Sequence, residues 1–304
     1  MDSRHSQTLT DLRPGGWLAR VRSNFFARPA NEVPSLAVVW WHALLCTMAA
    51  VNVAIWSLAA MAVTHAPAGN HAEASAASRM QLILSAAYVF GCAFRSVLPV
   101  YDIPRVVLID SRLSSVIVGR SVATIAELCF AAQWALMLHR MALLSDSLPV
   151  LAASVVIVPL IVLAEVCSWY AVLTTAQRPH ALENSIWGIS AALLVASLLV
   201  VEPHRITGLY LPMIAWCVGG ATYVAYIFLV DVPGYWSRWI ADQANGRRYL
   251  GIAQGVIDAW RRRVVSYRWE LWKNEILWMS LYFTLGVWSS VSLVYASIIL
   301  GAGK

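Results

Sequence analysis

Two glutamates and two arginines lie within apolar segments that are long enough to cross a membrane. Arg120, Thr124 and Glu127 are spaced four and seven residues apart in one such segment, and these offsets return to the same face of a helix. Glu165 lies in the following apolar segment and Arg95 in the preceding one. Ionisable groups are costly inside a bilayer, so each of these side chains is a candidate functional residue.

These residue types predict a polar cavity that handles protons and an anionic group. Two neighbouring carboxylates in a low-dielectric interior do not both ionise readily, so one of them can hold a proton near neutral pH. Glu127 and Glu165 are therefore the predicted catalytic residues. A guanidinium binds phosphate or carboxylate with two hydrogen bonds. The predicted substrate-binding residues are the four arginines of this region: Arg95, Arg105, Arg112 and Arg120.

The segment between the second and third apolar runs, YDIPRVVLIDSR, adds carboxylates next to these arginines. Asp102 and Asp110 are the candidates for binding a divalent cation. An alternative interpretation of all the buried charges is a structural ion network that fixes the register of the helices.

The composition of the chain is that of a membrane protein. Of its 304 residues, 60% are hydrophobic and 12% are charged, whereas a soluble domain is about 45–50% apolar and about 25% charged. Several uncharged runs exceed about 18 residues, the length that crosses a bilayer. The predicted fold is all-α, a polytopic bundle of about seven transmembrane helices. The expected spans are 36–64, 80–101, 115–143, 148–175, 184–201, 208–230 and 276–300.

Basic residues are distributed unevenly along this pattern. Most of those outside the spans fall in the N-terminal arm and in the segments after the second, fourth and sixth spans, whereas the other side has Arg79, Arg205 and Lys304. The positive-inside rule then predicts a cytoplasmic N-terminus and an external C-terminus. The expected location is a bacterial inner (plasma) membrane.

Two segments on the predicted cytoplasmic side have an amphipathic pattern. Residues 14–28 mix aromatic side chains with arginines, and residues 231–274 carry a stripe at three-to-four spacing: Tyr249, Ile252, Val256, Trp260 and Val264. Both are expected to lie in the headgroup plane, as anchors or as a cover over a site. The chain thus divides into an arm (1–35), a six-span bundle (36–230), this arginine- and tryptophan-rich segment (231–274), and a seventh span with a short tail (275–304).

Residue types argue against several cofactors and partners. A retinal Schiff base requires a buried lysine in the last span, and residues 276–300 contain none. Bis-histidine haem needs two histidines at similar depth, whereas His42 and His139 are predicted near opposite ends of the bundle. The net charge of +6 is attributed to membrane topology and not to nucleic-acid binding. Membrane lipids are the expected partners.

Three functions remain open at this level. The first is an enzyme acting on a lipid, isoprenoid or similar amphiphile whose anionic head the arginines would bind. The second is a proton-coupled small-molecule transporter or exporter that uses Glu127 and Glu165 as a relay. The third is a non-catalytic subunit or assembly partner of a membrane complex, whose arginine-rich surface would dock a cytoplasmic protein.

Overall fold

The computed structural model describes residues 34–65, 72–201 and 208–302, and it confirms the multi-span helical architecture. The described residues contain seven helices that are long and apolar enough to cross a membrane. The first five spans are single helices: α2 (Leu36–His65), α3 (Ala72–Val97), α4 (Val116–Ser145), α5 (Leu148–Thr174) and α6 (Gln177–Val200). The predicted amphipathic stretch 14–28 lies outside the described residues.

The last two spans are each interrupted by a π-helical turn. α7 (Tyr210–Tyr226) continues through η3 (Ile227–Asp231) into α8 (Val232–Ala244). In the same way, α10 (Trp269–Leu281) continues through η4 (Tyr282–Gly286) into α11 (Val287–Ala302). Such π turns are rare and occur frequently at functional sites.

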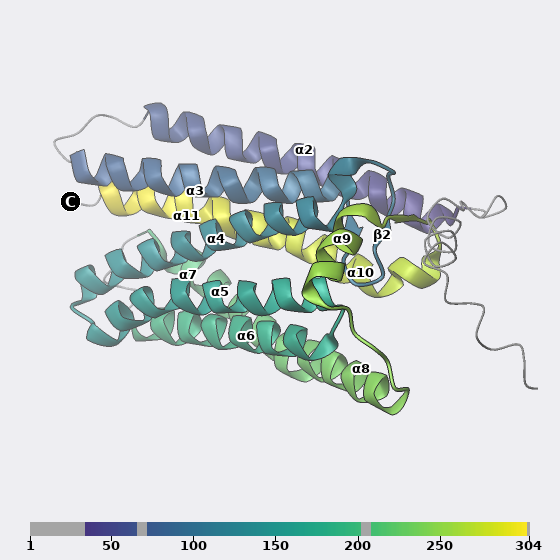
Figure 1. Ribbon diagram of the computed structural model, residues 1–304. Coiled ribbons are helices and arrows are strands. Elements are labelled where there is room, and N and C mark those ends of the chain that lie inside the picture. The colour runs from purple at the N-terminus through teal and green to yellow at the C-terminus, as the bar shows by residue number, and fades with distance from the viewer. Residues whose placement is uncertain (1–33, 66–71, 202–207, 303–304) are drawn as a thin grey trace, which may run out of the picture.

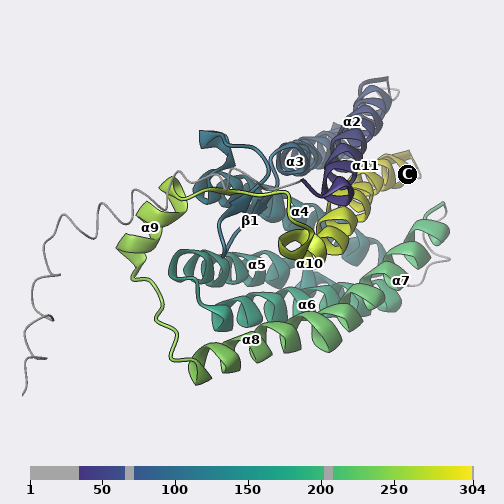
Figure 2. The same ribbon diagram turned by 90° about the vertical axis from the view of Figure 1, so that its right-hand side faces the viewer.

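The spans form two groups that meet at α4. In one group α3 packs against both α2 and α11, and in the other α6 packs against α5, α7 and α8. α4 contacts α3 on one side and α5 on the other (Figures 1 and 2). The first span begins and the last span ends at opposite ends of the bundle, as an odd number of crossings requires (Figure 1).

Several helix boundaries differ from the prediction. α3 begins at Ala72 and not at 80, and the seventh span begins at Trp269 and not at 276. α3 ends at Val97 and not at residue 101, because the residue before Pro99 is biased away from the helical conformation. α6 begins at Gln177, seven residues before the predicted start at 184. The sixth span does not stop at 230, because η3 carries the helix past Asp231, and Pro233 falls in the first turn of α8, where its missing N–H is tolerated.

One end of the bundle, which we call the α9 end, carries small elements that the all-α prediction did not include. Strands β1 (Val100–Tyr101), β2 (Val106–Val107) and β3 (Val264–Val265) form a sheet in that order, antiparallel and then parallel. A short 3-10 helix, η1 (Arg112–Ser114), leads into α4. The segment between α3 and α4 and the segment between α8 and α10 thus meet at this end, through the pairing of β2 with β3.

Helix α9 (Ile252–Arg261) lies across the ends of α4 and α5 at the same place (Figure 2). Its small residues Gly255 and Ala259 are buried against the bundle, and a Cβ on Gly255 would lie 2.0 Å from the Leu173 carbonyl oxygen. The apolar side chains Val256 and Trp260, part of the predicted stripe, are exposed. α9 is therefore amphipathic, with its smallest residues packed against α5.

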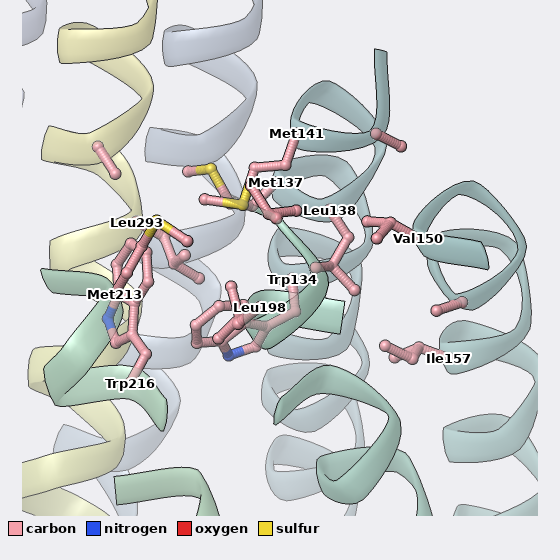
Figure 3. Close-up of a cluster of buried hydrophobic side chains, with 14 of the residues drawn as sticks. Trp134, Met137, Leu138, Met141, Val150, Ile157, Leu198, Met213, Trp216 and Leu293 are labelled. Atoms are coloured by element: carbon pink, nitrogen blue, oxygen red, sulfur yellow. The ribbon is translucent and has the colours of Figure 1, made fainter. Parts of the chain in front are cut away.

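The opposite end of the bundle is filled by an apolar cluster. Trp134 of α4 and Trp216 of α7 pack edge to face, with ring centroids 5.2 Å apart. Leu198, Met213 and Leu293 surround them, from α6, α7 and α11 (Figure 3). The two ends thus differ in character, with an apolar core at one and charged loops at the other.

Candidate functional site: a buried charge network

Arg120 and the two intramembrane glutamates form one hydrogen-bonded network. Nη2 of Arg120 on α4 donates to Glu127 Oε2 at 2.8 Å and to the two carboxylate oxygens of Glu165 on α5, at 2.8 and 2.7 Å. Thr124 Oγ1 also donates to Glu165, and Trp169 Nε1 donates to Thr124 Oγ1 at 3.0 Å. Arg120 and both glutamates are buried, so the network is held away from solvent.

The network extends to two further spans. Glu183 Oε1 on α6 lies 3.9 Å from Arg120 Nη2, and His180 Nδ1 lies 2.7 Å from Glu183 Oε2. From η4, the Tyr282 hydroxyl donates to Glu127 Oε1 at 2.9 Å. The predicted span 184–201 leaves Glu183 and His180 outside it, and the predicted site does not include Tyr282. Because α6 begins at Gln177, Glu183 and His180 both lie on this helix and within the network. Their spacing of three residues was the sequence feature that could have indicated their contact.

Carboxylates outnumber cations in this network. Three glutamates surround one guanidinium, and even with His180 protonated one negative charge is unbalanced. Uncompensated charge is expensive in a low-dielectric interior, so charge balance calls for an additional proton or cation. Two buried polar atoms, Arg120 Nε and Ser168 Oγ, also lack a hydrogen-bond partner among the described residues. Buried polar atoms are nearly always satisfied, so these positions suit water or a polar ligand.

A second group of charges lies toward the α9 end. Arg95 occupies the last turn of α3, and its Nη2 is 3.9 Å from Asp102 Oδ1. Glu275 of α10 interacts electrostatically with Asp102, Asp231 and Arg238. Arg95 is also within electrostatic range of Glu127 and so connects the two groups.

Uncharged polar side chains continue from the network toward the apolar end, between α3, α4 and α11. The rings of Tyr282 and Tyr88 pack edge to face with centroids 6.0 Å apart. Ser290 Oγ lies 2.6 Å from Gln133 Oε1 and 3.0 Å from Ser85 Oγ. Tyr88, Ser85, Gln133 and Ser290 are buried, and Tyr282 is half-buried.

The same line reaches the far ends of these helices. Gln81 Nε2 donates to the Gln133 carbonyl at 2.8 Å, and Gln81 Oε1 has no partner among the described residues. Arg140 Nη1 donates to Ser297 Oγ at 2.9 Å, and Ser78 Oγ lies 3.1 Å from Ser297 Oγ. At about 1.5 Å per residue, Arg120 and Arg140 are about 30 Å apart along α4, the thickness of a hydrocarbon core. Buried polar groups therefore occur at intervals through the whole bundle.

Arg105 lies apart from the network and fastens the α9 end. Its side chain is fully buried and donates to Asp258 Oδ2 at 2.9 Å, to the Asp102 carbonyl at 2.6 Å and to the Val172 carbonyl at 2.9 Å. Its φ of 58° is in the left-handed region, which disfavours non-glycine residues. Hydrogen bonds to the β1–β2 turn, α5 and α9 hold it in that conformation.

The remaining predicted site residues are at the surface. Arg112 is exposed at the start of η1 and has no described ion pair. Asp110 is 68% exposed and accepts a hydrogen bond from Arg263 Nε at 3.3 Å. The proposed metal ligands Asp102 and Asp110 thus belong to different ion pairs. Within the described ranges, no group of three or more His, Cys, Asp or Glu residues is placed to hold a metal ion.

Comparisons with protein-family models, curated proteins and solved structures found no match to this chain. Its function is therefore inferred from residue chemistry and geometry.

Proposed function

We propose that this protein is a proton-coupled membrane transporter for a small molecule. The observation that carries the proposal is the Arg120–Glu127–Glu165 network together with the separate polar clusters that follow it at intervals along α3, α4 and α11. Proton relays in membrane proteins consist of such interior acidic and polar groups. A structural ion pair would need neither the surplus carboxylates nor the polar line beyond them.

The unbalanced carboxylate is the proposed proton-binding site. Glu127 and Glu165 share the Nη2 group of Arg120, so a proton on either one changes how strongly the arginine binds the other. A neutral carboxyl group accepts hydrogen bonds more weakly than a carboxylate does. Protonation of Glu127 would therefore weaken its bonds to Arg120 and Tyr282 together.

Tyr282 can couple protonation of Glu127 to bending of the seventh span. It is the first residue of η4, the π turn that interrupts the seventh span, so its bond to Glu127 joins the proton site to a point where the helix can bend. The ring of Trp278 lies 5.7 Å from that of Tyr282 and stacks on Tyr226 at 5.9 Å. Tyr226 immediately precedes η3, so the sixth and seventh spans are in contact close to their π-helical turns.

The difference between the two ends supports an access route for the transported molecule. Charged residues near the α9 end, including Asp102, Asp231 and Glu275, offer polar surroundings. The Trp134–Trp216 cluster closes the other end (Figure 3). We propose that the transported molecule enters from the α9 end, the end that the positive-inside rule predicts to be cytoplasmic.

An enzyme acting on a lipid, isoprenoid or similar amphiphile is the second candidate function. It is favoured by the Nε atoms of Arg95 and Arg120, two buried donors without a partner among the described residues, which could bind an anionic head. The principal obstacle is that Nη2 of Arg120 is already shared by Glu127 and Glu165.

Proteoliposomes containing a pH-sensitive dye separate these functions. Outward gradients of a lipophilic amine, an amino-acid mixture, a nucleoside and glycerol phosphate would be applied in turn. We expect at least one gradient to change the internal pH with the wild-type protein. Glu127→Gln and Glu165→Gln should abolish the response, and Tyr282→Phe should slow it.

Asp110→Asn is the matched control, because Asp110 is an exposed carboxylate that pairs with Arg263 at the surface. This variant should respond like the wild type. Proton movement that is absent with every solute, or equal in wild type and Glu127→Gln, would refute proton coupling. Chemical conversion of an added amphiphile that is lost in Glu127→Gln would instead establish the enzyme.

A further inference from the structure

A cavity of about 580 Å³ lies at the α9 end, apart from the buried charge network. Its walls come from the β1–β2 turn, the junction of α5 and α6, the segment before α9, α9 itself and the first turns of α10. This volume is in the range of small-molecule sites, about 300–1,000 Å³.

The cavity has a surplus of positive charge. Three arginines line it: Arg247, Arg248 and Arg262. Its two acidic residues each have a close cationic partner. Asp258 accepts from the buried Arg105 at 2.9 Å, and Glu270 accepts from Lys273 Nζ at 2.6 Å.

The three arginines differ in how far their charge is already balanced. Arg247 pairs with Asp242 at 3.1 Å. Arg248 forms no ion pair with an acidic residue in the described part of the chain. Arg262 is 3.9 Å from Asp258, whose nearer partner is Arg105. Two of the three guanidiniums are therefore available to an anion.

Gln177 adds a requirement of a different kind. It is the first residue of α6, it is 7% exposed, and its Oε1 has no hydrogen-bond partner among the described residues. Within the described residues no side chain caps this helix, and Gln177 and Arg178 contribute the N–H groups of its first turn. A helix N-terminus favours anions, whereas the Gln177 oxygen needs a hydrogen-bond donor. The complementary ligand carries both a negative charge and a hydroxyl group.

Tyr101 also lines the cavity and contributes a phenol hydroxyl group. Burial raises the pKa of its phenol above the ordinary value, because desolvation disfavours the phenolate. The phenol is therefore neutral at physiological pH and can donate to an anion.

We propose that this cavity binds a phosphate ester with free hydroxyl groups, of the kind found in glycerol phosphate. Arg248 and Arg262 bind the phosphate together with the N-terminus of α6, and Gln177 accepts a hydrogen bond from a hydroxyl. The same chemical group occurs in the headgroup of phosphatidylglycerol and in soluble glycerol phosphate. The site is independent of the proposed transport function.

Binding to the purified full-length protein tests this assignment with two probes. Native mass spectrometry would measure retention of phosphatidylglycerol against phosphatidylcholine, and calorimetry would measure the affinity for soluble glycerol 3-phosphate. One charged hydrogen bond changes affinity by roughly tenfold or more. The Arg248→Ala/Arg262→Ala variant should therefore weaken binding of the preferred probe by at least about tenfold. Both arginines are exposed, so the variant should fold.

Arg112→Ala/Arg261→Ala is the matched control, because both of its arginines are exposed, lie at the same end and do not line the cavity. It should bind like the wild type. Gln177→Ala should weaken glycerol 3-phosphate without changing the affinity for sulfate, an anion with no hydroxyl.

Loss of phosphatidylglycerol alone in the cavity variant identifies a lipid headgroup, and loss of glycerol 3-phosphate binding identifies a soluble ligand. Equal weakening in the control variant, or no binding of either probe, would overturn the proposal.

Discussion

Replacing Arg120 with methionine should strongly destabilise the protein. The substitution keeps an apolar stem of similar length but removes the guanidinium group that neutralises Glu127 and Glu165. Arg120 makes its three hydrogen bonds to these carboxylates from one nitrogen, and each charged hydrogen bond is worth roughly 1.5–3 kcal/mol. Such contributions do not add when they share a donor, and removal of one partner from a buried ion pair costs about 3–5 kcal/mol.

That loss is large enough to measure as a thermal shift. At about 2 °C per kcal/mol, the lower slope for chains of 150–250 residues, Tm should fall by about 6–10 °C. A thiol-reactive fluorescent dye reports unfolding through Cys92, a free cysteine buried within α3, when the four half-buried cysteines are replaced by alanine in every variant. Heating rate and detergent must be fixed, since membrane proteins often unfold irreversibly.

A triple variant separates charge from packing. Arg120→Met combined with Glu127→Gln and Glu165→Gln removes the orphaned charges along with the arginine, and neutral replacement of a whole buried network is often nearly neutral in energy. It should recover most of the lost Tm. An unchanged Tm in Arg120→Met, or a triple variant no more stable than the single one, would show that the network does not depend on charge balance.

Two further predictions concern the α9 end. Gly255→Ala places a Cβ 2.0 Å from the Leu173 carbonyl oxygen, so α9 should separate from α5. Its amides should exchange roughly 5- to 160-fold faster, the range for an overpacking cost of about 1–3 kcal/mol. Gly251→Ala, where a Cβ meets nothing within 4 Å, should leave exchange unchanged, and protection of α9 retained in Gly255→Ala would contradict the packing. Arg105→Met leaves Asp258 and two carbonyl groups without their donor and should cost about 3–5 kcal/mol in the thermal assay. Arg112→Ala, at an exposed position, should stay within about 0.5 kcal/mol of the wild-type stability. Equal Tm shifts for the Arg105 and Arg112 variants would contradict a structural role for the hydrogen bonds of Arg105.

The architecture could be predicted from the sequence because a bilayer leaves few alternatives. A backbone inside hydrocarbon must satisfy its own hydrogen bonds, so each apolar run of sufficient length becomes a helix. All seven predicted spans occur in the described residues for this reason. The predicted helix boundaries were less accurate where polar residues lie at the end of a span. Glu183 and His180 suggested a loop, yet they belong to α6, where contacts with Arg120 and with each other satisfy them.

Part of the charge network also followed from local rules. Arg120 and Glu127 are seven residues apart on one helix, so helical geometry alone places them on one face. The partnership with Glu165 required the packing of α4 against α5, and the bond from Tyr282 joins residues 155 positions apart. Neither contact has a local signal.

The different placements of Arg105 and Arg120 show the limit of residue type as a guide. Both arginines have acidic residues nearby in the sequence, and the sequence predicts that both bind the substrate. The β1–β2 turn, α5 and α9 surround Arg105 and accept from its donors. Arg120 shares one nitrogen between two carboxylates, and its Nε has no partner in the described part of the chain. Hydropathy and helical period are local properties that the sequence determines by itself. Whether a buried charge is structurally occupied or chemically available depends on which distant elements pack around it, and only the tertiary structure decides that.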